Sequence, residues 1–166
     1  MFEITLRETV EADYSFLKQW FECPENNVLF TSELRNILEY KKFFFLMALS
    51  DKKNMYYSVL EKSSSTLIGF VALINIDYGD QLAQIWYLLG DNSFRGKGIM
   101  TRAVQMVLSK AKQELALHSV HTWVVEDNIA SIKVLERNGF EEIGVQREAY
   151  FYEKIYKDRI LFHKIL

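Results

Sequence analysis

A glycine-containing loop between a predicted strand and a predicted long helix is the feature that most limits how this chain can fold. Only 7 of the 166 residues are glycine, and three of them lie within residues 90–98. Residues 82–89 are predicted to form a strand, and after Gly98 the apolar residues recur at helical spacing. Such a loop brings unpaired backbone N–H groups and the positive end of a helix dipole together, which favours a phosphate group.

The rest of the chain alternates between strand and helix periodicity, and turn signals such as Ser63-Ser64-Ser65 separate the segments. Asn128 is a plausible N-cap and Gly139 a plausible C′ residue for one helix. We therefore expect a mixed α/β fold with one central sheet in the order βααβββαβαββ. Its strands are predicted at residues 2–7, 55–60, 66–76, 82–89, 118–125, 140–152 and 156–166, and its helices at 11–21, from Thr31 or Ser32 to about Ser50, from Ile99 to Leu115, and at 129–138.

Composition predicts one soluble domain spanning residues 1–166. Hydrophobic residues make up 49% of the chain and charged residues 25%, which is ordinary for a globular protein. A net charge of −2 gives no electrostatic footprint for nucleic acid or for an acidic membrane surface. No run reaches the roughly 18 apolar residues of a membrane span. The single cysteine, Cys23, favours a reducing compartment, so we expect a cytoplasmic protein.

The residues of the loop narrow the kind of phosphate it would bind. Arg95 and Lys97 add positive charge, and Gly96 and Gly98 let a pyrophosphate approach the backbone. The loop lacks P-loop spacing, and Thr101 stands where a dinucleotide fingerprint has its third glycine. A plain strand–helix turn that uses glycine for tightness is the alternative.

Two motifs resemble the GCN5-related N-acetyltransferase (GNAT) family. The run Arg95-Gly96-Lys97-Gly98-Ile99 is similar to its acetyl-CoA signature, Arg/Gln-x-x-Gly-x-Gly/Ala, although Met100 departs from the last position. The runs Asn128-Ile129-Ala130-Ser131 and Arg137-Asn138-Gly139-Phe140 resemble its second motif. Within the family, these runs look most like the branch that acetylates the N-termini of ribosomal proteins.

The resemblance implies a single GNAT-like α/β domain. Its sheet would be mixed and mostly antiparallel, flanked by helices and splayed between the fourth and fifth strands. Acetyl-CoA would be the co-substrate, and no metal would be needed. Backbone groups of the fourth strand would hold the pantetheine arm and polarise the thioester, and the loop would hold the pyrophosphate. The implied cofactor-binding residues are Tyr87, Leu88, Leu89, Arg95, Gly96, Lys97, Gly98, Ile99, Met100, Thr101, Asn128 and Ser131.

The acid and base of the reaction are less clearly marked. Many relatives carry a tyrosine acid where this chain has Leu135, and a glutamate where it has Gln84. Ser131 matches a serine of the ribosomal-protein branch, and Tyr150 stands where that branch has glutamate. Glu148, two residues earlier, would share the face of Tyr150 and accept a proton through water. Alternatively, the enzyme positions an amine that is already neutral. The candidate catalytic residues are Ser131, Tyr150, Glu126 and Glu148.

The acceptor amine is left open by the sequence. A protein N-terminal amine follows from the branch, and a small-molecule amine such as an amino sugar, polyamine or antibiotic is the alternative. The replacements at Leu135 and Gln84 also suggest a catalytically silent acyl-CoA sensor. The first two helices would roof the acceptor site, with Trp86 as a lining candidate. We expect a monomer or homodimer, and no metal site at His118 and His121, which would face opposite sides of a strand.

Overall fold

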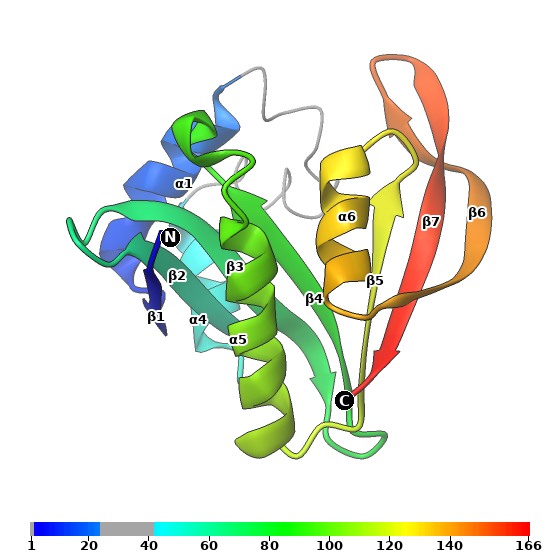
Figure 1. The fold of residues 1–166 in the computed structure, drawn as a ribbon, viewed down its shortest axis with the longest axis horizontal. Helices are drawn as coiled ribbons and strands as arrows, with labels where there is room; N and C mark the ends of the chain where they lie inside the picture. Colours follow the sequence, from blue (N-terminus) through cyan, green and yellow to red (C-terminus); the bar gives the residue numbers. More distant parts are fainter. Residues whose placement is uncertain (1, 24–41) are drawn as a thin grey trace.

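The computed structural model describes residues 2–23 and 42–166 as a single seven-stranded sheet with helices on both faces (Figure 1). The strand order is β1-β2-β3-β4-β5-β7-β6. No helix within these ranges is long and apolar enough to span a membrane. The strands are β1 Ile4–Glu8, β2 Met55–Glu61, β3 Leu67–Asp77, β4 Leu82–Leu89, β5 Ser119–Val125, β6 Glu141–Tyr152 and β7 Ile155–Ile165. The helices are η1 Glu11–Asp13, α1 Tyr14–Phe21, α4 Lys42–Ser50, η2 Asn92–Phe94, α5 Ile99–Gln113 and α6 Ile129–Arg137.

The predicted α/β architecture and its mostly antiparallel sheet are confirmed. All neighbouring strands pair antiparallel except β4 and β5, which are parallel. The predicted start of the second helix at Thr31 or Ser32 lies outside the described residues, which include only its end in α4. The predicted extension of α5 to Leu115 is wrong, because the helix ends at Gln113 and Ala116 takes a left-handed φ of 52°.

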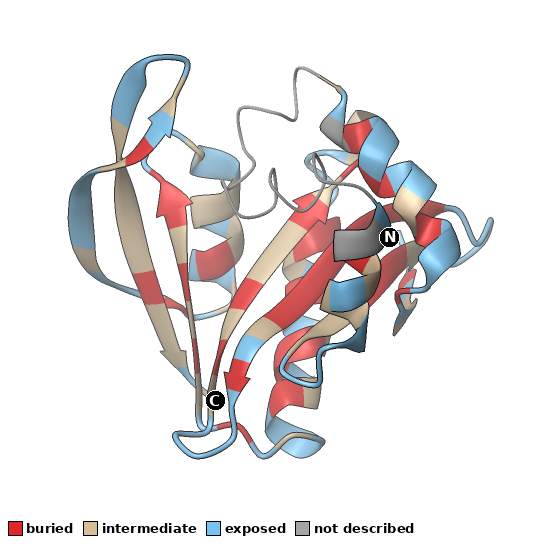
Figure 2. Cartoon of the chain, turned by 180° about the vertical axis from the view of Figure 1, so that it is seen from behind, coloured by how far each residue is buried: buried red, intermediate tan, exposed pale blue. Residues whose placement is uncertain are grey.

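Two apolar layers hold the helices on the sheet. On one face, α5 inserts residues such as Ala103, Val104 and Val107 into the main core with β3 and β4. On the other face, α1 and α4 bury Leu17, Trp20 and Phe45 against Phe70 and Leu88. Burial is uneven along the sheet: β3 is almost wholly buried, whereas β6 at the edge is largely exposed (Figure 2).

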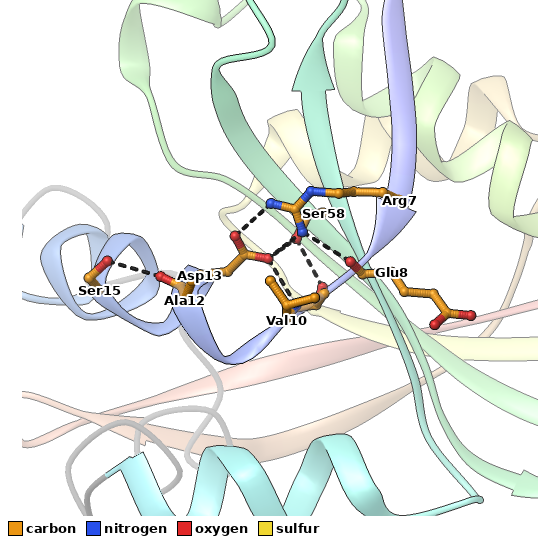
Figure 3. Close-up of polar contacts among 8 residues, drawn as sticks. Arg7, Glu8, Val10, Ala12, Asp13, Ser15 and Ser58 are labelled. Carbon is orange, nitrogen blue, oxygen red and sulfur yellow. Dashed lines mark hydrogen bonds and ion pairs between the residues drawn. The ribbon is translucent and has the colours of Figure 1, made fainter.

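A buried carboxylate fixes the first helical turn to the sheet (Figure 3). Asp13 is only 3% exposed and accepts two hydrogen bonds from Arg7 of β1, at 2.6 and 2.7 Å. It also accepts from the backbone N–H of Val10 and from the Ser58 hydroxyl of β2. Burial alone would raise the pKa of Asp13, but these donors together lower it. The carboxylate therefore ties β1, β2 and the start of α1 together.

Candidate functional site

The parallel pairing of β4 with β5 is short, and the two strands then part. Only three residue pairs join them, of which Gln84↔His121 is the last. Beyond this pair β4 continues to Leu89 and β5 to Val125, and the strands diverge (Figure 1). Within the described residues, the edge of β4 that faces β5 therefore makes no ladder hydrogen bonds to that strand beyond Gln84. Backbone N–H and C=O groups of this kind are strong binding groups for a ligand. The predicted splay between the fourth and fifth strands is confirmed.

The three glycines that follow β4 have different structural roles. A Cβ at Gly90 would lie 1.8 Å from the Trp20 ring, so this glycine allows α1 to pack on the end of β4. Gly96 and Gly98 have left-handed φ angles of 75° and 72°, and a Cβ there would meet nothing within 4 Å. Both residues are exposed, and Gly98 immediately precedes α5. The loop thus leaves open space beside the first backbone N–H groups of that helix.

The side chains of the predicted cofactor loop divide into exposed and buried groups. Arg95 and Lys97 are exposed, and the Lys97 ammonium lies 4.3 Å from the Phe2 ring centroid and 4.9 Å from that of Phe94. Ile99 and Met100 are buried in the main core. They therefore face a ligand only through their backbone. The loop offers two cations and a series of amides.

A second set of predicted residues begins α6 and reaches β4. The Asn128 side chain caps the helix by accepting a hydrogen bond from the Ser131 backbone N–H at 3.2 Å, as the sequence predicts. The Tyr87 hydroxyl, on β4, donates to the Ser131 carbonyl oxygen at 3.1 Å. Burial raises the pKa of Tyr87 well above its usual range, so its hydroxyl stays a donor. The sequence prediction used only the backbone of Tyr87 and missed this contact.

The end of α6 is fixed against the start of α5. The Asn138 amide donates to the carbonyl oxygen of Thr101, at 3.1 Å, and to that of Val134, at 2.8 Å. Gly139 follows with a left-handed φ of 72°, as its predicted C′ position requires. These contacts explain physically why an Asn-Gly pair follows α6. Asn138 joins α6 to α5, and Gly139 ends α6.

Tyr150 lies on the opposite face of the sheet from Ser131. It is 2% exposed, and its ring centroid lies 6.3 Å from that of Trp123 and 6.4 Å from that of Tyr152. Ser131 belongs to α6, whose apolar residues Ile132 and Leu135 join the core beneath α5. The two predicted catalytic residues would therefore approach one reacting group only from different sides of the divergence of β4 and β5.

Both glutamates predicted as bases contact Asp158 of β7, Glu126 through its carboxylate and Glu148 through its backbone N–H. The Glu126 carboxylate accepts a hydrogen bond from the Asp158 N–H, and the Glu148 N–H donates to the Asp158 carboxylate. The expectation that Glu148 shares the face of Tyr150 is wrong. The register of β6 shifts between Gln146 and Tyr150, Glu148 has a φ of 51°, and its side chain is exposed. A bulge of this kind breaks the alternation on which the expectation rests.

One arginine near Tyr150 was missed by sequence reasoning. The Arg159 guanidinium carbon lies 3.8 Å from the ring centroid of Trp123. Its Nε is buried and has no hydrogen-bond partner among residues 2–23 and 42–166. The sequence gives little signal for this residue, because β7 also carries Lys157 and Asp158 directly before Arg159. We call Trp123, Tyr150 and Arg159 the Trp123 cluster.

The remaining candidates are the two positions where relatives carry an acid or a base, and the histidines considered as metal ligands. Leu135 is fully buried in the core, and Gln84 is the last residue of β4 that pairs with β5. His121 pairs across the sheet with His163, and burial, followed by the charge of His163, lowers its pKa. In the part of the chain that the structure describes, no group of three or more His, Cys, Asp or Glu side chains is placed to hold a metal ion.

Comparison with known proteins identifies a family. The sequence pattern described as "Acetyltransferase (GNAT) domain" matches residues 3–141. The chain is 34% identical over 133 residues to the probable N-acetyltransferase YjcK of Bacillus subtilis, covering 80% of this chain and 68% of the relative.

Two solved structures share the fold. The ribosomal-protein-S5-alanine acetyltransferase from Vibrio fischeri superposes with a TM-score of 0.80 at 22% identity, over 99% of this chain and 94% of that one. The dodecameric spermidine N-acetyltransferase from Vibrio cholerae gives a TM-score of 0.82 at 21% identity, over 98% and 93%.

Proposed function

The chain belongs to the GNAT family of N-acetyltransferases, and from this membership we propose that residues 1–166 act as one unit that acetylates the α-amine of a peptide or protein N-terminus. The observation that carries the proposal is the divergence of β4 and β5 beside the glycine loop. The loop offers an anion site on one side of the sheet, and the Trp123 cluster offers an aromatic and cationic surface on the other.

The residues of the loop fit acetyl-CoA. The pyrophosphate would be held by backbone N–H groups from Gly96 to Thr101, with Arg95 and Lys97 supplying positive charge. The unpaired edge of β4 at Tyr87, Leu88 and Leu89 would bind the pantetheine arm, together with Asn128 and Ser131 at the start of α6. Acetyl-CoA supplies an activated acyl group and a thiol leaving group.

The chain's own groups would then perform three tasks. Backbone N–H groups on the free edge of β4 stabilise the negative charge that develops on the carbonyl oxygen. Tyr150 or Ser131 supplies a proton to the departing sulfur, and Glu126 or Glu148 takes a proton from the amine through water. Among these groups we favour Tyr150 as the proton donor, because it is buried beside the Trp123 ring on the face from which the amine would enter.

Two alternatives remain open to experiment. A small-molecule amine is supported by the spermidine N(1)-acetyltransferase of Vibrio cholerae, which is a relative at 25% identity. A silent acyl-CoA sensor is supported by Leu135 and Gln84 in place of a tyrosine and a glutamate. For the assembly we propose a cytoplasmic monomer or homodimer. Light scattering tests the assembly, and a dodecamer would contradict it.

The deciding experiment measures thiol release from acetyl-CoA with N-terminal peptides, spermidine and amino sugars as acceptors. We expect turnover to be fastest with the peptides. Calorimetric titration with CoA provides the control. Tight CoA binding without turnover on any amine would favour the sensor, and preferential turnover of spermidine or an amino sugar would favour the small-molecule alternative.

A further inference from the structure

The face of the sheet opposite α5 carries two tryptophans beside the divergence of β4 and β5. Gln84 and His121 are paired across these strands, so their side chains point to the same face. Trp86 and Trp123 follow two residues later on each strand and share that face. Trp86 packs on the side of α1 and α4, with its ring centroid 6.0 Å from that of Tyr56. The two rings therefore flank the point from which an amine would reach the strands.

Arg159 belongs to the same face. It pairs with Val125 on β5, two residues beyond Trp123, and its guanidinium stacks on the Trp123 ring. Tyr150 pairs with Lys157, two residues before Arg159, which places the tyrosine on this face too. The Trp123 ring offsets part of the free-energy cost of desolvating the Arg159 guanidinium. It accepts no conventional hydrogen bond from the Arg159 Nε.

The charge of Arg159 is not compensated by a carboxylate in the described residues. No ion pair or hydrogen bond joins its guanidinium to an acid, and its Nε is buried without an acceptor. The nearby acids have other partners: Asp127 pairs with Lys157, and Asp158 accepts from the Glu148 N–H. A buried donor without an acceptor is costly, and Arg159 as a whole is only partly buried, so a ligand oxygen can reach its guanidinium and would gain affinity there.

We propose that Arg159 binds a carbonyl or carboxylate oxygen adjacent to the acceptor amine. This inference rests on the proposed function and narrows its acceptor. A peptide α-amine has a carbonyl oxygen on the neighbouring carbon, and that oxygen accepts from the guanidinium. A polyamine offers N–H donors and further positive charges, which a guanidinium repels. Arg159 thus selects peptide or amino-acid amines against polyamines.

The test compares Arg159→Met with Arg147→Met. Methionine keeps an unbranched apolar side chain against Trp123, and Arg147 is an exposed arginine on β6 that serves as the control for loss of charge. Initial rates are measured with an N-terminal tripeptide amide and with spermidine. For Arg159→Met we expect the KM of the tripeptide to rise about tenfold or more, as for loss of a hydrogen bond to a charged group. The KM of acetyl-CoA should stay within about twofold of the wild-type value, and Arg147→Met should behave as wild type.

Two outcomes would overturn the inference. One is an unchanged KM for the tripeptide amide in Arg159→Met at an unchanged melting temperature. The other is an equal loss of kcat/KM for tripeptide and spermidine, because a merely structural role would affect both acceptors alike. Arg159→Lys gives a further check: it keeps the charge but loses Nε, so we expect it to restore only part of the tripeptide affinity.

Failure of the proposed function can be separated from failure of this inference. If the wild-type chain acetylates none of the amines, the proposed function is wrong, and equilibrium binding then decides the role of Arg159. The CoA-saturated chain is titrated with glycinamide and with n-propylamine, a similar amine that lacks the carbonyl. Tighter binding of glycinamide that disappears in Arg159→Met supports the inference. Equal binding of the two amines by the wild type refutes it.

Discussion

The loop at residues 90–98 and the Trp123 cluster are built in different ways. The loop is contiguous in sequence, and its properties come from backbone: two left-handed glycines and the first amides of α5. The Trp123 cluster takes one side chain each from β5, β6 and β7, and its properties come from a tilted ring–ring contact, a guanidinium–ring contact and one unpaired N–H. We therefore expect neutral side-chain substitutions to affect ligand binding less in the loop than in the Trp123 cluster.

This contrast has a consequence for specificity. In the proposed loop site, amides and a helix terminus supply most of the binding to phosphate, so neutral side-chain changes there should matter less than charged ones. In the proposed acceptor site, by contrast, one substitution such as the loss of Arg159 should change which amine is preferred. The difference is consistent with relatives whose names include both ribosomal-protein and spermidine acetyltransferases.

The largest effect is expected from Tyr150→Phe, which tests the Trp123 cluster. Phenylalanine keeps the ring beside Trp123 and removes only the hydroxyl. If Tyr150 supplies the proton to the departing thiolate, kcat should fall about a hundredfold, within the usual range for loss of a general acid. The measurement is kcat against pH, with Tyr152→Phe on the same hairpin as the control. An unaltered pH profile and kcat in Tyr150→Phe would show that the proton comes from another group.

The loop at residues 90–98 is tested by comparing the variants Gly98→Asp and Gly98→Asn. Both side chains tolerate a left-handed φ better than most, have nearly the same size and would project into open space, so they differ mainly in charge. If the loop holds the pyrophosphate, the aspartate variant should bind CoA about thirtyfold more weakly than the asparagine variant through like-charge repulsion. Isothermal titration calorimetry measures this ratio. Equal affinities would place the pyrophosphate elsewhere.

Local patterns were sufficient to predict the sheet, the loop and the caps. Asn128 and Gly139 could be placed because capping depends on residues within one turn. Glu148 could not be placed, because a bulge in β6 follows from pairing with β7 and leaves no periodic signal. Arg159 was missed for a related reason: its contact with Trp123 joins two strands separated by a helix and a third strand.

Asp13→Asn is expected to have a smaller effect and to affect the loop and the Trp123 cluster alike through stability. Asparagine keeps acceptors for Val10 and Ser58 but loses the charge opposite Arg7, which should cost about 1.5 kcal/mol of unfolding free energy. Because the folded-state pKa of Asp13 is lowered, its contribution is complete above its ordinary pKa of 3.8 and is lost as the pH falls through the folded-state value.

Urea denaturation of Asp13→Asn and wild type at pH 7 and near pH 3 measures this dependence. The difference in unfolding free energy should be largest at pH 7 and shrink at the lower pH. A difference that is equal at both pH values would show that the ion pair with Arg7 is not its source. Glu3→Gln is a suitable control, because its exposed ion pair with Lys62 should contribute little.

The smallest effect is expected from Tyr87→Phe. It bears most directly on the contrast between a loop that uses backbone groups and a Trp123 cluster that uses side chains. Tyr87 is the one predicted cofactor-binding residue of β4 for which the structure gives a side-chain hydrogen bond, from its hydroxyl to the Ser131 carbonyl oxygen. Loss of one neutral hydrogen bond should cost about 1 kcal/mol, or roughly a fivefold weaker binding of CoA if this bond holds α6 in place beside β4. Calorimetry with CoA measures the change, and kcat with saturating acetyl-CoA should stay within about twofold of the wild-type value.

A much larger fall in kcat than in CoA affinity would mean that the Tyr87 hydroxyl takes part in proton transfer. Side chains would then take part in the reaction on both faces of the sheet. The contrast between backbone groups on one face and side chains on the other would have to be abandoned.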